Sequence, residues 1–265
     1  MSKVGAVESV WRYPVKSMAG ESLDDVFVGY AGVFGDRFCA FLNAAAPHEG
    51  FPFLTGRNNG AMLRYRPRFR DQSLATRPVN QAAAEGLGPG ITPLYPAPLD
   101  RLGIDVETPG GGVLDIDSPA LRSMLATNAI EADKLSLIRS DRALTDCRPI
   151  SLISHRTIAQ LSDETGSPLD PRRFRANIYA DLGAAEGFAE DAFVGKRVRI
   201  GERAIIAVLD RDPRCKMISL DPDTGEENAN VLRQVAKAHD SRAGVYCAVL
   251  TEGTVRRGDE IELLD

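Results

Sequence analysis

Cys215 is the residue whose immediate neighbours best equip it for chemistry. Arg214 stands directly before it and Lys216 directly after it. The apolar segment 204–209 predicts a strand, and Pro213 interrupts the regular continuation of that strand. Nearby positive charge lowers the pKa of a thiol, and the thiolate is both the nucleophile and the metal ligand. The pattern therefore favours a reactive thiolate on a loop, with a small buried cysteine that only packs as the open alternative.

Polar groups also stand at the ends of two other predicted strands. Lys16 and Ser17 follow the alternating run 4–13, and Arg37 opens the apolar run that begins at Asp36. An ammonium, a hydroxyl and a guanidinium in such places can hold a phosphate or another anion. A solvated turn is the alternative, and it is the commoner case for Lys16 and Ser17 taken alone.

The segment 171–178 carries a third set of polar side chains. If it is a strand, alternation sends Arg173, Arg175 and Asn177 to one face and the apolar side chains to the other. Guanidinium and amide groups on one face form a surface suited to anions and amides. A solvated edge strand would show the same pattern.

Ser154 is predicted to cap a helix over 155–165 that ends at Gly166. The free N–H groups of the first helical turn, together with the serine hydroxyl, can bind an anion. A plain helix cap is the common alternative.

Composition limits the function classes. The chain has 265 residues, with 43% hydrophobic and 26% charged residues, as in an ordinary globular protein. The formal net charge of −5 argues against general nucleic-acid binding but allows a local cationic pocket. The four cysteines form no CxxC pair and the three histidines are isolated, so a zinc site or iron–sulfur cluster from neighbouring ligands is not expected. A chain of this length does not need a disulfide framework.

The first fifteen residues lack the long apolar stretch of a signal peptide, and no run of about 18 apolar residues is present. We therefore expect no membrane span and a cytoplasmic location.

Many short predicted strands, separated by Gly/Pro turns, indicate a mainly β protein with a few helices (α+β). Ser118 and Pro119 start a helix where the strand-rich first half ends. We predict two β-barrel-like domains, residues 1–118 and 119–265. The segments 44–60 and 77–98 are predicted to be loops, with a short basic strand over 62–70 between them. Residues 221–225 are predicted to form a turn.

Five motifs in order give the chain a family resemblance. They are YPVKS near the start, GDRF, RFRANI with a later AED, PRC followed by DPDTG, and a terminal G-x-V-R-x-GDEIEL. Together they resemble the MOSC family, the molybdenum cofactor sulfurase C-terminal-type domains, here with the N-terminal β-barrel domain that often precedes MOSC. The amidoxime-reducing component subgroup and its bacterial relatives are the most similar.

The resemblance implies a mononuclear molybdenum enzyme in which molybdopterin holds the metal from one side. Cys215 would be the protein ligand of the metal and the catalytic residue, and soft thiolate ligation suits such a metal. Cofactor-binding roles carry over to Lys16, Ser17, Arg37, Ser154, Arg175, Asn177, Arg214 and Cys215. Pyridoxal phosphate binding is a further property that the resemblance suggests.

The implied activity is reduction of small N-hydroxylated or N-oxygenated compounds, with two electrons, two protons and release of water. Electrons would come from a separate protein, either a ferredoxin, a flavodoxin or a cytochrome b5-like protein with its reductase. The chain departs from the family at Pro213, where a hydroxyl residue is common. The residues leave the general acid open among water, Asp210 and Asp212. A carrier of molybdenum cofactor or persulfide sulfur is the alternative function, and a β-barrel binding protein without redox chemistry is a weaker third.

Overall fold

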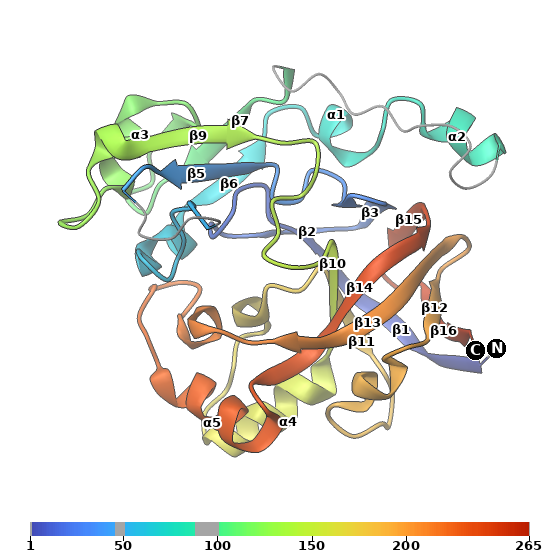
Figure 1. Cartoon of the computed structure of the whole chain (residues 1–265). Helices are drawn as coiled ribbons and strands as arrows, with labels where there is room; N and C mark the ends of the chain where they lie inside the picture. The colour runs from blue at the N-terminus through green and yellow to red at the C-terminus, as the bar shows by residue number, and fades with distance from the viewer. Residues whose placement is uncertain (1, 46–50, 88–100, 265) are drawn as a thin grey trace.

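The computed structural model describes residues 2–45, 51–87 and 101–264 (Figure 1). Its strands are β1 (Ser2–Arg12), β2 (Glu21–Leu23), β3 (Asp25–Gly29), β4 (Gly32–Val33), β5 (Cys39–Asn43), β6 (Arg66–Phe69), β7 (Ile104–Glu107), β8 (Val113–Asp115), β9 (Leu135–Arg139), β10 (Ile150–Ser154), β11 (Ile178–Asp181), β12 (Arg197–Ile200), β13 (Ala204–Pro213), β14 (Arg242–Thr251), β15 (Gly253–Arg256) and β16 (Glu260–Leu264). The helices are α1 (Gln72–Thr76), α2 (Gln81–Leu87), α3 (Pro119–Leu125), α4 (His155–Thr165) and α5 (Ala229–His239). Short 3₁₀ turns are η1 (Gly60–Arg64), η3 (Ala132–Lys134), η4 (Pro171–Phe174), η5 (Ala189–Phe193) and η6 (Lys216–Ser219). The prediction of a mainly β protein with a few helices is confirmed.

A closed ring of strands dominates the C-terminal part of the molecule. Its order is β11-β10-β14-β13-β12-β16-β1, and β1 closes the ring because it pairs with β11 as well as with β16. Only β10 and β11 run parallel among these neighbours. Figure 1 shows both chain ends on this barrel, since β1 and β16 lie side by side.

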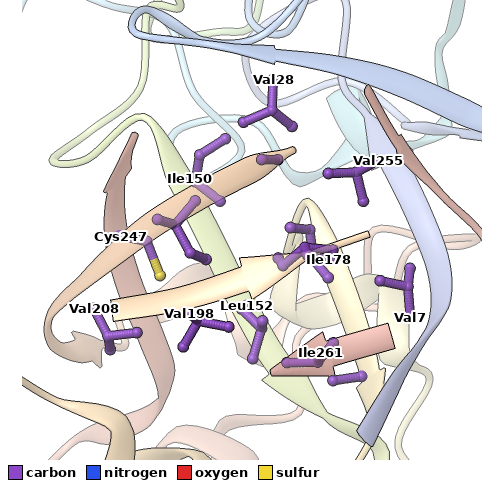
Figure 2. Close-up of a cluster of buried hydrophobic side chains, with 14 of the residues drawn as sticks. Val7, Val28, Ile150, Leu152, Ile178, Val198, Val208, Cys247, Val255 and Ile261 are labelled. Atoms are coloured by element: carbon purple, nitrogen blue, oxygen red, sulfur yellow. The ribbon is translucent and has the colours of Figure 1, made fainter. Parts of the chain in front are cut away.

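The barrel interior is an apolar core built from every strand of the ring (Figure 2). In β1, Val7 and Val10 both point inward although they are three positions apart, because a bulge shifts the register between Val7 and Ser9. Cys247 on β14 is fully buried among these side chains, as expected of a packing cysteine.

Among the other strands of the first half, β5 to β8 form small sheets around a second core, whereas β2 extends the barrel sheet and β3 and β4 pair with β15. β5 pairs with β9, while β6, β7 and β8 form a three-stranded sheet. Phe41, Ile104, Leu121 and Leu135 are buried between these elements, and Cys39 packs with them. Strand pairing thus crosses the predicted boundary at 118/119 in three places, because β1 joins the barrel, β3 pairs with β15 and β9 joins the first sheets. That boundary stays a prediction.

A third core lies under α4 and α5, which pack side by side below the barrel in Figure 1. Ser154 caps α4 by accepting a hydrogen bond from Arg156 N, and Gly166 ends the helix with a φ of 69°. Both features agree with the sequence. None of the helices in the described part of the chain is long and apolar enough to cross a lipid bilayer.

Two loop and strand predictions differ from the structure. The segment 77–98 was expected to lack regular structure, but Gln81–Leu87 forms α2, and residues 88–98 lie outside the described residues. Alanines outweigh Gly86 there as helix formers. The predicted strand over 62–70 begins only at Arg66, because Gly60–Arg64 is a 3₁₀ turn capped by Asn59.

Candidate functional site

A cavity of about 420 Å³ lies where the barrel meets the first-half sheets. Its walls come from several distant segments, including the loops after β1, β9 and β13 and the turn η4. Seven of the eight predicted site residues line it: Lys16, Ser17, Arg37, Arg175, Asn177, Arg214 and Cys215. The fold therefore brings together residues that are as much as 199 positions apart (215 − 16).

Cys215 enters the cavity from the end of β13. This strand runs to Pro213, four residues beyond the predicted end, because two register shifts after Val208 bend it while it stays paired with β14. Cys215 then precedes the turn η6 and is partly buried. Lys216, expected beside the thiol, does not line the cavity, since its ammonium pairs with Glu227 over 2.9 Å.

Lys16, Ser17 and Arg37 meet because two segments are joined by backbone hydrogen bonds. Lys16 N donates to the carbonyl of Cys39 over 2.8 Å, and Arg37 N donates to that of Tyr13 over 2.7 Å. The Lys16 side chain is buried, donates to the carbonyl of Leu144 and pairs with Asp146. Burial lowers the pKa of Lys16, and Asp146 opposes this.

Arg175 reaches the cavity by a route different from the predicted strand. Residues 171–174 form the turn η4, and Arg175 ends it with a φ of 53° before β11 begins at Ile178. Pro171, at the first position of the turn, explains the start, with Asp170 as its cap. A turn, not alternation along a strand, thus puts Arg173, Arg175 and Asn177 on the cavity wall.

Arg175 is held in place by a carbonyl and an aromatic ring. Its Nη1 donates to the carbonyl of Met18 over 2.7 Å, and its guanidinium lies 4.3 Å from the ring centre of Tyr13. Burial, with the nearby charge of Arg37, lowers the pKa of Arg175 to about 10. A negative charge in the cavity would offset both the burial of the Arg175 guanidinium and its repulsion from Arg37.

Arg214 is fixed just as tightly. Its Nε donates to the carbonyl of Ala243 over 2.7 Å and its Nη1 to that of Phe174 over 2.9 Å. The remaining nitrogen, Nη2, lies 2.9 Å from a carboxylate oxygen of Asp212, in a contact without hydrogen-bond geometry. Arg214 is thus rigidly placed beside Cys215.

Asn177 and Ser151 line the cavity where the barrel closes. The side-chain carbonyl of Asn177 accepts from Ser151 N over 3.2 Å, and its amide donates to the carbonyl of Trp11 over 3.3 Å. Asn177 therefore ties β1, β10 and the start of β11 together. Ser154, the eighth predicted residue, does not line the cavity. It is fully buried, and its N–H donates to Glu190 over 3.1 Å.

Buried guanidinium nitrogens without a hydrogen-bond partner are concentrated on this cavity. Among the described residues they belong to Arg57, Arg173, Arg175 and Arg214 on the cavity wall, and to Arg211 elsewhere. Leaving a buried donor unsatisfied is costly, so such atoms point to a ligand that accepts hydrogen bonds.

Backbone strain and the charge of the cavity wall also indicate a binding site for an anion. Ser17, Arg37 and Arg175 have φ values of 64°, 44° and 53°, and such strain is typical of functional sites. The wall carries seven cations and two carboxylates in a chain with a net charge of −5. The cations are Lys16, Arg37, Arg57, Arg148, Arg173, Arg175 and Arg214.

Asp212, and not Asp210, is the carboxylic acid of β13 that faces the cavity. Its side chain is buried, and burial raises its pKa to about 6 although Arg214 opposes the rise. Asp210 is exposed and pairs with Arg242 over 3.2 Å. Asp212 is therefore a carboxylic acid on the same cavity wall as Cys215 that keeps its proton up to about pH 6.

Four further residues of the wall carry no sequence-based prediction. Arg57, Asp146, Cys147 and Arg148 all line the cavity. The segment 145–148 places four consecutive polar groups directly before a buried strand, and this signal could have identified it. Arg57 lies in a segment predicted only as a loop, and no local pattern marks it.

The donor set fits an anionic cofactor that brings its own metal ligands. Among the described residues, no group of three or more His, Cys, Asp or Glu side chains could hold a metal ion. One thiol and several unpartnered guanidinium nitrogens instead suit a metal bound mainly by its cofactor, with anionic and hydrogen-bond-accepting groups.

Comparisons with known proteins match a known family to the part of the chain that contains Cys215. Residues 139–262 match the model of the MOSC domain family. The chain is 24% identical to mitochondrial amidoxime reducing component 2 of Bos taurus, over 98% of this chain and 84% of that protein. It is also 24% identical to mitochondrial amidoxime-reducing component 1 of Mus musculus, over 100% of this chain and 84% of that protein.

Among solved structures, the YuaD protein of Bacillus subtilis is similar with a TM-score of 0.47 and 14% identity, covering 98% of this chain and 94% of that one. None of these comparisons bears on pyridoxal phosphate, which stays a prediction. The two amidoxime relatives are named mitochondrial, so a cytoplasmic location also stays a prediction.

Proposed function

We propose that this protein, whose residues 139–262 are a MOSC domain, binds the molybdenum cofactor through Cys215 and reduces N-hydroxylated or N-oxygenated compounds. The observation that carries the proposal is the placing of the partly buried Cys215 thiol on a cavity wall rich in guanidinium groups. Two of these groups, Arg173 and Arg175, each have a buried nitrogen with neither a hydrogen-bond partner nor an ion pair among the described residues. The names of the two mammalian relatives suggest the reaction class, the reduction of amidoximes.

Each wall residue has a distinct part in this proposal. Cys215 would be the protein ligand of molybdenum, and Arg214, the next residue on the wall, would contact the anionic cofactor. Lys16, Ser17, Arg37 and Arg175 would hold the anionic and polar groups of the cofactor, while Asn177 would keep Ser151 and the barrel seam in position. When bound, the cofactor supplies a two-electron centre for cleavage of an N–O bond.

Asp212 is the residue of this chain best placed to hold a proton for the released water. It is buried, lines the cavity, and has one carboxylate oxygen without a hydrogen-bond partner. Two protons and two electrons are needed for each N–O bond that is reduced to N–H and water. The electrons would come from a separate protein, because no cysteine spacing in the chain suits an iron–sulfur cluster.

Turnover with a small-molecule donor tests the proposal. The protein, purified from a host that makes the cofactor, would receive benzamidoxime and dithionite-reduced methyl viologen. We expect benzamidine from the wild type, none above background from Cys215→Ser, and near wild-type amounts from Cys147→Ser, a matched control on the same wall. Equal turnover by Cys215→Ser and the wild type would contradict the proposal.

A carrier of molybdenum cofactor or persulfide sulfur is the second candidate. The observation that favours it is the second thiol, Cys147, on the same wall as Cys215, because sulfur can pass between neighbouring thiols. Transfer of cofactor to a molybdenum apo-enzyme, without benzamidoxime turnover, would favour the carrier. Turnover without transfer would favour the reductase.

A further inference from the structure

Exposed arginines alternate along the segment that ends in β6. Arg64, Arg66, Arg68 and Arg70 are exposed, whereas the residues between them are buried. Arg70 is neutralised, since its guanidinium contacts Asp105 at 2.6 Å and Asp115 at 2.5 Å. This arrangement leaves three arginines, which we call the arginine face: Arg64, Arg66 and Arg68.

The arginine face keeps most of its charge. Arg68 stands opposite Asp105 in the register of β6 and β7, but the Asp105 carboxylate is engaged by Arg70. Arg66 has one loose contact with Glu107, at 3.5 Å between exposed groups, and such pairs are weak. Within the described part of the chain, Arg64 and Arg68 form no ion pair.

One alternative explanation is protection of a sheet edge. β6 is the outer strand of its sheet, and exposed charge on such a strand discourages aggregation. Protection of a sheet edge would not require the arginines to lie near the cofactor cavity. Two of them do lie near it.

Two of these arginines line a second, smaller cavity of about 150 Å³. Arg66 and Arg68 share its wall with Trp11, Tyr13 and Arg175. Arg175 also lines the cofactor cavity, so this one side chain stands between the two cavities. A protein seated on the arginine face would therefore lie one side chain from the cofactor cavity.

We propose that the arginine face is the docking surface for an acidic electron-donor protein of the ferredoxin class. This inference rests on the proposed function, which requires electrons from a separate partner. Charge complementarity carries it: a basic face on an acidic chain attracts a negatively charged protein and orients it before contact.

Binding can be measured without the cofactor or turnover. Trp11 is the single tryptophan of the chain and lines the second cavity, so its fluorescence reports on a bound protein. The titrant would be an oxidised, acidic ferredoxin that lacks tryptophan. We expect quenching of the Trp11 fluorescence and at least tenfold weaker binding when salt rises from about 20 mM to about 200 mM.

Charge reversal locates the surface. Arg66→Glu/Arg68→Glu should bind ferredoxin at least tenfold more weakly at low salt, and Arg66→Gln/Arg68→Gln should fall between it and the wild type. Arg233→Glu/Lys237→Glu changes the net charge equally on exposed positions of α5 and should bind as the wild type does. Wild-type affinity in the Arg66→Glu/Arg68→Glu variant, or no binding by the wild type, would overturn the docking proposal.

Turnover rates with two different electron donors distinguish a failure of the docking proposal from a failure of the proposed function. With ferredoxin as the donor, Arg66→Glu/Arg68→Glu should lose at least tenfold in rate, whereas with reduced methyl viologen it should keep the wild-type rate. Equal rates with ferredoxin would overturn the docking proposal alone. A wild type that is inactive with methyl viologen would contradict the proposed function, and the fluorescence result would still decide the docking proposal.

Discussion

Arg37 donates a hydrogen bond from Nη2 to the backbone carbonyl oxygen of Arg175 over 3.0 Å, although the two residues are 138 positions apart. Both guanidinium groups also lie against the ring of Tyr13, at 4.4 and 4.3 Å from its centre. Two like charges are thus held together on one wall, with Asp36 compensating Arg37 at 2.5 Å. Because Arg175 has no carboxylate partner in the described residues, an anionic ligand is the group that would complete the site.

Replacing Arg175 by Met tests whether this arginine binds an anionic ligand in the cavity. The variant should lose bound cofactor about tenfold or more faster on dialysis, since a hydrogen bond from a charged group contributes about 1.5–3 kcal/mol. The free energy of unfolding of the cofactor-free protein should change by less than about 1 kcal/mol, because repulsion with Arg37 is relieved as one hydrogen bond is lost. Cofactor release is followed by fluorescence of the oxidised pterin.

Arg172→Met is the matched control for that experiment. Arg172 is adjacent in sequence but pairs with Asp170 and Asp223, both at 2.6 Å, and does not line the larger cavity. Cofactor retention should match the wild type. Equal retention in Arg175→Met would remove Arg175 from the proposed binding set.

The two cations beside Cys215 should behave differently. Arg214→Gln should slow alkylation of Cys215 by the anionic reagent iodoacetate at about pH 7, because the fixed guanidinium on the same cavity wall attracts an anion. Lys216→Gln should leave the alkylation rate within about twofold of the wild type, since Lys216 pairs with Glu227 away from the cavity. Mass spectrometry of the Cys215 peptide gives both rates. A larger effect of Lys216→Gln would show that sequence proximity, not the observed side-chain placement, sets the thiol environment.

Asp212 should give the cofactor-free protein a defined pH dependence. Burial raises the Asp212 pKa from its ordinary value of 3.8 to about 6, so the folded state holds this proton more tightly than the unfolded state. The contribution of Asp212 to stability is therefore greatest when it is protonated and falls as the pH rises from about 4 to about 6. Relative to the wild type, Asp212→Asn should gain up to about 3 kcal/mol in unfolding free energy over this range.

Urea unfolding of both proteins at several pH values measures this difference. Asp210→Asn provides the control, because Asp210 is exposed and paired with Arg242. The difference in unfolding free energy between Asp212→Asn and the wild type should vary more with pH than that between Asp210→Asn and the wild type. A constant difference for Asp212→Asn would contradict the raised pKa.

Much of the fold follows from local pattern. The cap and stop of α4, the turn at 221–225 and most barrel strands agree with the sequence because capping, turn chemistry and alternation are local signals. The pairing of β1 with strands at the C-terminus could not be predicted in this way, since no local pattern specifies a partner more than 160 residues distant.

The residues of the cavity wall could be predicted only in part, for physical reasons. Ser154 was predicted to bind an anion, but the serine of β10 on the wall is Ser151; the two are three positions apart and so face opposite sides of β10. Arg175 lines the cavity through a left-handed turn that alternation cannot describe. Arg57 and Asp146 come from loops whose positions depend on the packing of the whole chain.

The most direct test of the central claim is the molybdenum content of the purified protein. Wild type, Cys215→Ser and Cys147→Ser would be expressed in a host that makes the cofactor and analysed for metal alongside circular dichroism spectra. We expect close to one molybdenum per chain in the wild type and in Cys147→Ser, and little in a folded Cys215→Ser. Equal molybdenum in folded Cys215→Ser, or none in the wild type after reconstitution with the cofactor, would contradict the assignment of Cys215 as the metal ligand.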